Sequence, residues 1–202
     1  QGVTSIISLS GSGYEYSTAS GLVRTSNFTA SNLLGQVIGS TARYGSDGSP
    51  LGAAGWFFDP LSGSTSPLEF SIGPGGVSTT SAQLLTESGL VLGTYQRFDG
   101  AGSTRSIFMW SASGGFADIL DLIPGGLAGT GLLSDHISLV GYGGESPSGI
   151  PRFILAKTRA IGQTNADAPF LISLVPSPAG TAAMLSASGL VAMRRRRTFI
   201  VD

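Results

Sequence analysis

The chain has 202 residues, of which 41% are hydrophobic, only 11% are charged and 31 are glycine. This length can bury a core, and the mean hydropathy of +0.27 argues against disorder, which requires low hydrophobicity and high charge. Without cysteine, disulfides and thiolate metal sites are excluded. Residues 1–178 carry seven Lys and Arg against eleven Asp and Glu, so this acidic body is not expected to bind nucleic acid.

Residues 1–29 contain short apolar pieces separated by small residues around Gly11 and Gly13, and they predict two or three strands. From residue 30 onward one plan recurs. A strand bounded by glycine is followed by a polar turn and then by an aromatic-rich strand. Asp47-Gly48 and Asp99-Gly100 lie between the two strand types, where a hairpin turn needs residues that tolerate positive φ.

The glycines Gly39, Gly93 and Gly141 anchor the three copies, 54 and 48 residues apart. Self-similarity at about 50 residues is typical of blade or solenoid proteins. We therefore predict that these glycines occupy equivalent positions in successive sheets. The aromatic residues Trp56, Phe108 and Phe153 are then expected to superpose.

These patterns predict an all-β protein. Its repeated antiparallel blades would form either a propeller-like array or a sandwich-like stack. A closed propeller typically needs at least four blades, so three units predict an open arrangement. The predicted β-domain covers residues 1–172, with units near 28–76, 77–126 and 127–172, and residues 173–202 form a separate tail.

The body resembles the HAF-type extracellular repeat of bacterial secreted proteins over roughly residues 28–160. This resemblance implies propeller-like blades. The third copy departs from the pattern, with Ile137 and Leu155 where glycine and tryptophan are usual. The matching residues are Gly35, Val37, Gly39, Trp56, Phe58, Gly89, Val91, Gly93, Phe108, Trp110, Asp121, Leu122, Gly125 and Gly126.

The tail contains an uncharged apolar stretch over residues 179–193, for which we predict a helix that stands apart from the body. Fifteen residues at about 1.5 Å each reach about 22 Å, so residues 171–175 would have to extend a membrane span. The four following arginines would stay cytoplasmic and leave the body outside. The alternative is a C-terminal helix that packs on the body.

The order of the tail resembles the PEP-CTERM sorting signal, in which a Val-Pro-Glu-Pro motif precedes a hydrophobic helix and an arginine cluster. Ser177 stands where Glu is usual, and residues 198–202 extend past the arginines. The resemblance implies export, transient insertion in the inner membrane, recognition by an exosortase-type enzyme, and a cell-surface or extracellular location. The matching residues are Val175, Pro176, Pro178, Gly189, Leu190, Arg194, Arg195, Arg196 and Arg197.

The expected function is that of a non-catalytic structural protein of the cell surface or extracellular matrix, with no cofactor or metal. The alternative is a carbohydrate-binding module that contacts exopolysaccharide, with Trp56 and Trp110 stacking on sugars. Both tryptophans also fit a purely structural role between sheets. A third hypothesis, a hydrolase, would depend on His136 beside Asp135.

Overall fold

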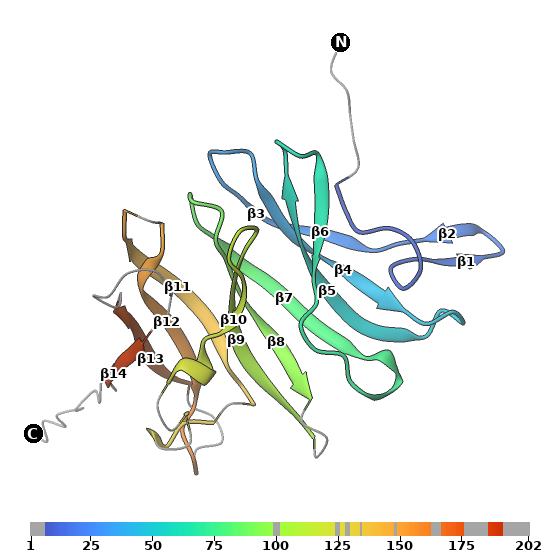
Figure 1. The fold of residues 1–202 in the computed structure, drawn as a ribbon. Helices are drawn as coiled ribbons and strands as arrows, with labels where there is room; N and C mark the ends of the chain where they lie inside the picture. Colours follow the sequence, from blue (N-terminus) through green and yellow to red (C-terminus); the bar gives the residue numbers. More distant parts are fainter. Residues whose placement is uncertain are drawn as a thin grey trace, which may run out of the picture.

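A computed structural model describes residues 7–98, 102–123, 126–127, 130–133, 135–147, 149–162, 167–175 and 186–191. Strands dominate, and the helical elements among these residues are two short 3-10 turns, η1 (Pro74–Gly76) and η2 (Leu120–Leu122). The sheets are open (Figure 1). The prediction of an all-β body is confirmed.

Twelve of the strands form three groups of four, which we call the first, second and third units. Within each unit every strand pairs antiparallel with the next one along the chain. The first unit contains β3 (Ser26–Ser31), β4 (Val37–Tyr44), β5 (Pro50–Asp59) and β6 (Ser64–Leu68). The second contains β7 (Ser78–Leu85), β8 (Val91–Phe98), β9 (Ser103–Ser111) and β10 (Gly115–Asp118). The third contains β11 (Ser138–Glu145), β12 (Pro151–Arg159), β13 (Asp167–Val175) and β14 (Ser186–Val191).

The units follow one another in space in the order of the chain (Figure 1). A short parallel pairing, Gly52 with Ser78 and Ala53 with Thr79, links β5 to β7 and joins the first two units into one eight-stranded sheet. The third unit is a separate four-stranded sheet. A small hairpin, β1 (Tyr16–Thr18) and β2 (Gly21–Val23), precedes the first unit.

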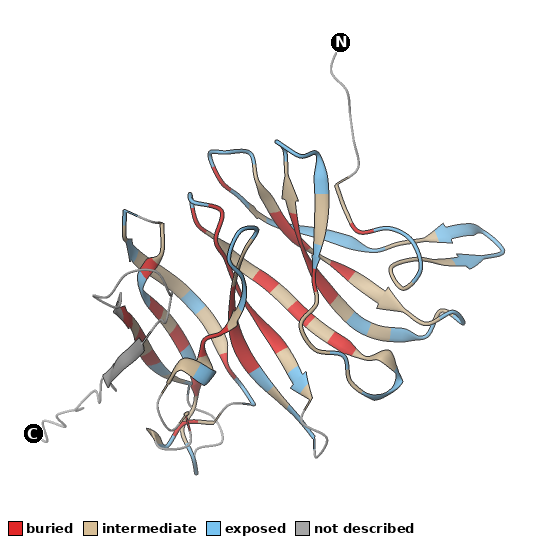
Figure 2. Ribbon diagram, viewed as in Figure 1, coloured by how far each residue is buried: buried red, intermediate tan, exposed pale blue. Residues whose placement is uncertain are grey.

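The second unit lies at the centre because both of its faces are buried. Successive residues of a strand point to opposite faces. In β8, Val91 and Tyr95 pack toward the first unit, whereas Leu92 packs toward the third. In β9, Phe108 packs toward the first unit and Ile107 packs toward the third. Figure 2 accordingly shows buried residues along β7, β8 and β9, whereas the β1–β2 hairpin is exposed.

Glycine lies beneath an aromatic ring in both of the first two units. Gly39 of β4 is paired with Trp56 of β5, and Gly93 of β8 is paired with Phe108 of β9. A Cβ atom at either glycine would overlap the paired ring and a backbone carbonyl oxygen of the preceding strand, Asn27 or Ser81. The close approach of ring and backbone therefore requires glycine at these two positions.

The third unit corrects the predicted equivalence of Gly141. Gly141 pairs with Leu155, and a Cβ atom there would meet open space. Gly143 instead lies beneath Phe153. This pair joins the first two strands of its unit, β11 and β12, whereas the glycine–aromatic pairs of the other units join the second and third strands. Phe153 is also 40% exposed, whereas Trp56 and Phe108 are buried. The physical reason is the irregularity of β11 between Leu139 and Gly141, which shifts the register.

The predicted turn at Asp47-Gly48 is confirmed. Gly48 has a φ of 81° and its amide donates to the carbonyl of Gly45, which closes the loop between β4 and β5. The predicted turn at Asp99-Gly100 lies outside the described residues.

The predicted C-terminal helix is not confirmed, because Ser186–Val191 forms β14 and pairs antiparallel with β13. The physical reason is that β13 offers backbone hydrogen bonds along its edge, while Ser, Gly and Val within this segment are weak helix formers. The remainder of residues 179–193 lies outside the described residues.

Candidate functional site

Trp56 lies in the core beneath the N-terminal segment. Its side chain is 2% exposed, and it packs with Leu9 and Ala54 in a small apolar cluster. The indole Nε1 donates to the hydroxyl of Ser26 at 3.2 Å. Because the ring covers Gly39 and is itself covered, stacking of a sugar on Trp56 would require the cluster to open. Its ligand role stays a prediction that this geometry does not favour.

Trp110 lies elsewhere, near the end of β9. It is partly buried and packs against Phe57 with a ring-centroid separation of 5.1 Å, at the interface of the first and second units. The structural counterpart of Trp56 in the second unit is Phe108 rather than Trp110, because Phe108 pairs with Gly93. The two tryptophans predicted to bind sugars therefore do not form one platform.

A groove of about 640 Å³ lies beside Trp56 on the outer face of the first unit. We call it the outer groove. β3, which is the end strand of the eight-stranded sheet, provides one wall. The segment around Ile7 and Ser8 provides the other, and Trp56 and Val37 form part of the floor. The lining residues are Ile7, Ser8, Arg24, Ser26, Phe28, Ser31, Val37 and Trp56.

Phe28 is the exposed aromatic residue of this lining, and the sequence analysis did not identify it. It projects from β3 and is 66% exposed. An apolar side chain flanked by polar ones, as in Ser26-Asn27-Phe28-Thr29, is a pattern that normally buries the apolar residue. The exposure of this ring could not be predicted from the strand alone, because it depends on how much of the sheet face the segment around Ile7 and Ser8 covers.

The polar groups of the groove differ in how many hydrogen bonds or ion pairs they already make. The Ser26 hydroxyl accepts from Trp56 and from Thr41, at 3.2 and 3.0 Å, and contacts the carbonyl of Ser40 at 3.3 Å. The Ser8 hydroxyl is buried, and it has no hydrogen-bond partner within the described part of the chain. Arg24 reaches Glu15 through one nitrogen at 3.7 Å.

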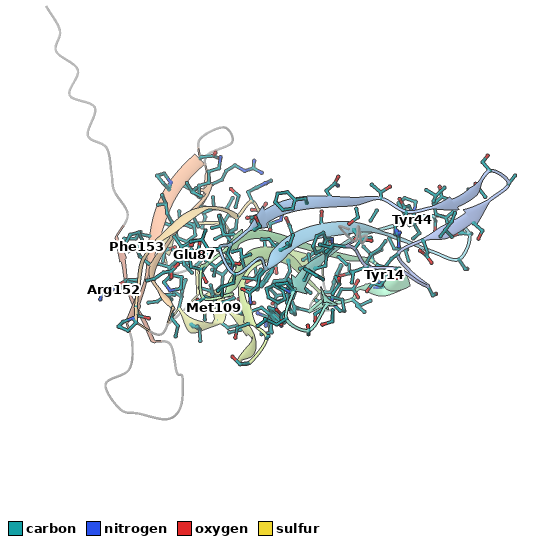
Figure 3. The ribbon with its side chains drawn as sticks, turned by 90° about the horizontal axis from the view of Figure 1, so that it is seen from above. Tyr14, Tyr44, Glu87, Met109, Arg152 and Phe153 are labelled. Carbon is teal, nitrogen blue, oxygen red and sulfur yellow. The ribbon has the colours of Figure 1, made fainter. Side chains whose placement is uncertain are left out.

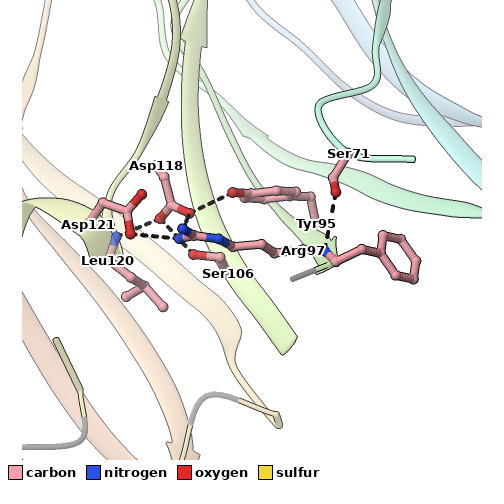
Figure 4. Close-up of polar contacts among 8 residues, drawn as sticks. Ser71, Tyr95, Arg97, Ser106, Asp118, Leu120 and Asp121 are labelled. Atoms are coloured by element: carbon pink, nitrogen blue, oxygen red, sulfur yellow. Dashed lines mark hydrogen bonds and ion pairs between the residues drawn. The ribbon is translucent and has the colours of Figure 1, made fainter. Parts of the chain in front are cut away.

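A second polar cluster centres on Asp118, the last residue of β10 (Figure 4). Its carboxylate is buried and accepts hydrogen bonds from the Tyr95 phenol and the Ser106 hydroxyl, each at 2.6 Å, and from the Leu120 amide at 2.9 Å. Arg97 approaches it at 3.6 Å. The cluster ties β8, β9 and β10 together, so its chemistry is structural.

Asp121 lies three residues after Asp118, but the two carboxylates have different partners. Asp121 is exposed and accepts from Arg97 at 2.7 Å. This hydrogen bond raises the pKa of the Arg97 guanidinium. Among the described residues no group of three or more His, Asp or Glu side chains could hold a metal ion.

Burial raises the pKa of the Tyr95 phenol, and its hydrogen bond to the Asp118 carboxylate raises it further. Because the folded-state pKa lies above the unfolded value of about 10, this group stabilises the fold fully below pH 10, and the contribution falls as pH rises further. We expect the free energy of unfolding to decline as the pH rises above about 10. Urea unfolding should show a shallower decline in Tyr95→Phe, and an equal decline would contradict this assignment.

His136 and Asp135 lie at an exposed turn before β11, with Nε2 of the histidine 3.2 Å from the carboxylate. Each side chain is about half exposed, at 46% and 56%. Catalysis at this pair stays a hypothesis.

Comparisons of the chain with protein-family models, curated proteins and solved structures found no match.

The residues of the predicted sorting signal fall at the end of the third unit. Val175 ends β13, and Gly189 and Leu190 belong to β14. Pro176, Pro178 and Arg194 to Arg197 lie outside the described residues. Within the described ranges, no helix has both the length and the apolar character needed to cross a membrane.

Proposed function

We propose that this protein is a non-catalytic structural protein of the cell surface or extracellular matrix. Its C-terminal segment directs export and sorting, with an exosortase-type membrane enzyme as the processing partner. The three units act as blades of an open array. The tail tethers the protein to the inner membrane until it is processed.

The order of the units along the molecule is the observation that carries this proposal. Tyr14 and Tyr44 mark one end of the molecule, and Arg152 and Phe153 of the third unit mark the other (Figure 3). The predicted sorting signal begins at Val175, the last residue of β13 in that third unit. A tether there would present the first unit and the outer groove away from the membrane, which suits a surface protein.

Entry of the tail into a bilayer requires a change of secondary structure. Strand β14 obtains its backbone hydrogen bonds from β13. In hydrocarbon a single segment must satisfy these groups internally, so only a helical form of the segment can cross. The tethered and the body-paired states of the tail therefore exclude each other.

Fractionation of cells that lack the processing enzyme tests the tether. We expect the full-length chain in the membrane fraction, and we expect a chain ending at Val175, or one with Arg194 to Arg197 replaced by serine, to leave it or change topology. Arg152→Ser, which removes an arginine from the body, should change nothing. A full-length chain that is soluble, with its tail protected from protease, would contradict the proposal.

A second candidate function is carbohydrate binding in the envelope or the exopolysaccharide matrix. The outer groove favours it, because an exposed phenyl ring and hydroxyl groups line the same concavity. Glycan-array binding tests this function on the wild-type chain. Loss of binding in Trp110→Ala would locate the site at the second unit, whereas loss in Trp56→Ala would need a folding control because Trp56 is buried.

A further inference from the structure

Equivalent faces of the first and second units are covered to different extents. On the second unit, Val91, Tyr95 and Phe108 are buried by the first unit. On the first unit, the corresponding face is covered by the short segment that contains Leu9 and Tyr14. This narrower cover leaves the outer groove open beside β3.

The open part of this face exposes an aromatic ring. Phe28 is 66% exposed, although Trp56 and Val37 beside it are buried or partly buried. Phenyl rings stack on apolar surfaces and present a large contact area with few rotatable bonds. The groove volume of about 640 Å³ also falls in the range of roughly 300–1,000 Å³ that holds small ligands.

Polar groups of the groove can form hydrogen bonds with a ligand. Arg24 carries five donors and contacts Glu15 only at 3.7 Å, through one nitrogen. Ser31 adds an exposed hydroxyl on β3. A ligand that bears several hydroxyl groups would satisfy these positions.

We propose that the outer groove binds a sugar residue of a polysaccharide, with the apolar face of the pyranose ring stacked on Phe28. Its hydroxyl groups bond to Arg24 and Ser31. A sugar fits because it combines an apolar C–H face with a rim of hydroxyls, as the groove combines a phenyl ring with polar groups. This site rests on the second proposed function, carbohydrate binding, and differs from the tryptophan sites first predicted.

Affinity electrophoresis of the full chain in gels that contain a soluble β-glucan or alginate tests the site. We expect the wild-type chain to be retarded by at least one of these polymers, and Phe28→Ala to weaken binding at least about tenfold. Phe153→Ala is the matched control, since it removes a half-exposed strand phenylalanine from the third unit. Thermal unfolding of each variant verifies that it is folded.

Ser31→Ala separates ligand binding from a structural role. Ser31 is exposed on β3, so removing its hydroxyl should leave the stability nearly unchanged. If Ser31 bonds to a sugar, the same change should weaken retardation several-fold. Unchanged retardation in both Ser31→Ala and Phe28→Ala would overturn the site.

The remaining outcomes distinguish the site from the function. Retardation that persists in Phe28→Ala but is lost in Trp110→Ala would reject the groove and keep carbohydrate binding. A wild-type chain that neither polymer retards would reject both. A concentration-dependent dimer that Phe28→Ala abolishes, without retardation by either polymer, would show that a second copy occupies the groove and would also overturn the proposal.

Discussion

Gly39→Ala and Gly93→Ala are expected to destabilise the fold by at least about 3 kcal/mol each, at the upper end of the range for overpacking in a core. The added methyl group would overlap both the paired aromatic ring and a carbonyl oxygen of the neighbouring strand. A ring can turn, but the carbonyls of Asn27 and Ser81 belong to paired strands and cannot move without disturbing the ladder. Since typical domains are stable by only about 5–15 kcal/mol, either variant should lose a large share of its stability.

Urea unfolding of the purified variants would measure this loss. Gly141→Ala is the matched control, because this glycine also lies in a strand and a Cβ atom there meets no neighbour. It should change the free energy of unfolding by less than about 0.5 kcal/mol, as surface substitutions usually do. If Gly39→Ala were as stable as Gly141→Ala, the close approach of Trp56 to β4 would be wrong.

The glycine–aromatic pairs also show what the sequence could predict. Gly39 and Gly93 were identified because a β-branched or apolar residue precedes each of them in a glycine-bounded strand and an aromatic strand follows. In the third unit the run Gly141-Tyr142-Gly143-Gly144 offers three glycines at nearly the same spacing. The choice among them depends on the register shift in β11, which is set by pairing with β12 and leaves no local signal.

The outer groove and the tail were beyond sequence reasoning for a related reason. The groove exists because a segment near Leu9 packs on strands β4 and β5, which lie far along the chain. The apolar stretch at 179–193 suits either a helix or a strand, since short apolar runs do not separate the two. The free edge of β13 decides in favour of a strand over Ser186–Val191.

The geometry of the buried hydrogen-bond network at Asp118 could not be predicted from the sequence either. Asp118 and Asp121 are three residues apart and look alike in the sequence. Asp118, at the end of β10, points toward Tyr95 and Ser106, whereas Asp121 lies in η2 and its side chain is exposed (Figure 4). The difference between them follows from pairing between β9 and β10, which places Asp118 opposite Phe108.

Asp118→Ala is therefore expected to lower the free energy of unfolding by about 3 kcal/mol, because it leaves the Tyr95 and Ser106 hydroxyls buried without their acceptor. Asp121→Ala removes an exposed partner of Arg97 and should cost less than about 1 kcal/mol. Urea unfolding at pH 7 would measure both changes.

A double variant decides whether the loss arises from unpartnered hydroxyls or from lost packing. Adding Tyr95→Phe to Asp118→Ala removes one orphaned hydroxyl while keeping the ring, which packs edge-on against Phe70 at 6.0 Å. Replacing both partners of a buried hydrogen bond by apolar groups costs less than removing one of them. The double variant should thus be more stable than Asp118→Ala alone. If it is equally or less stable, the hydrogen bonds of Asp118 are not what joins β8 to β10.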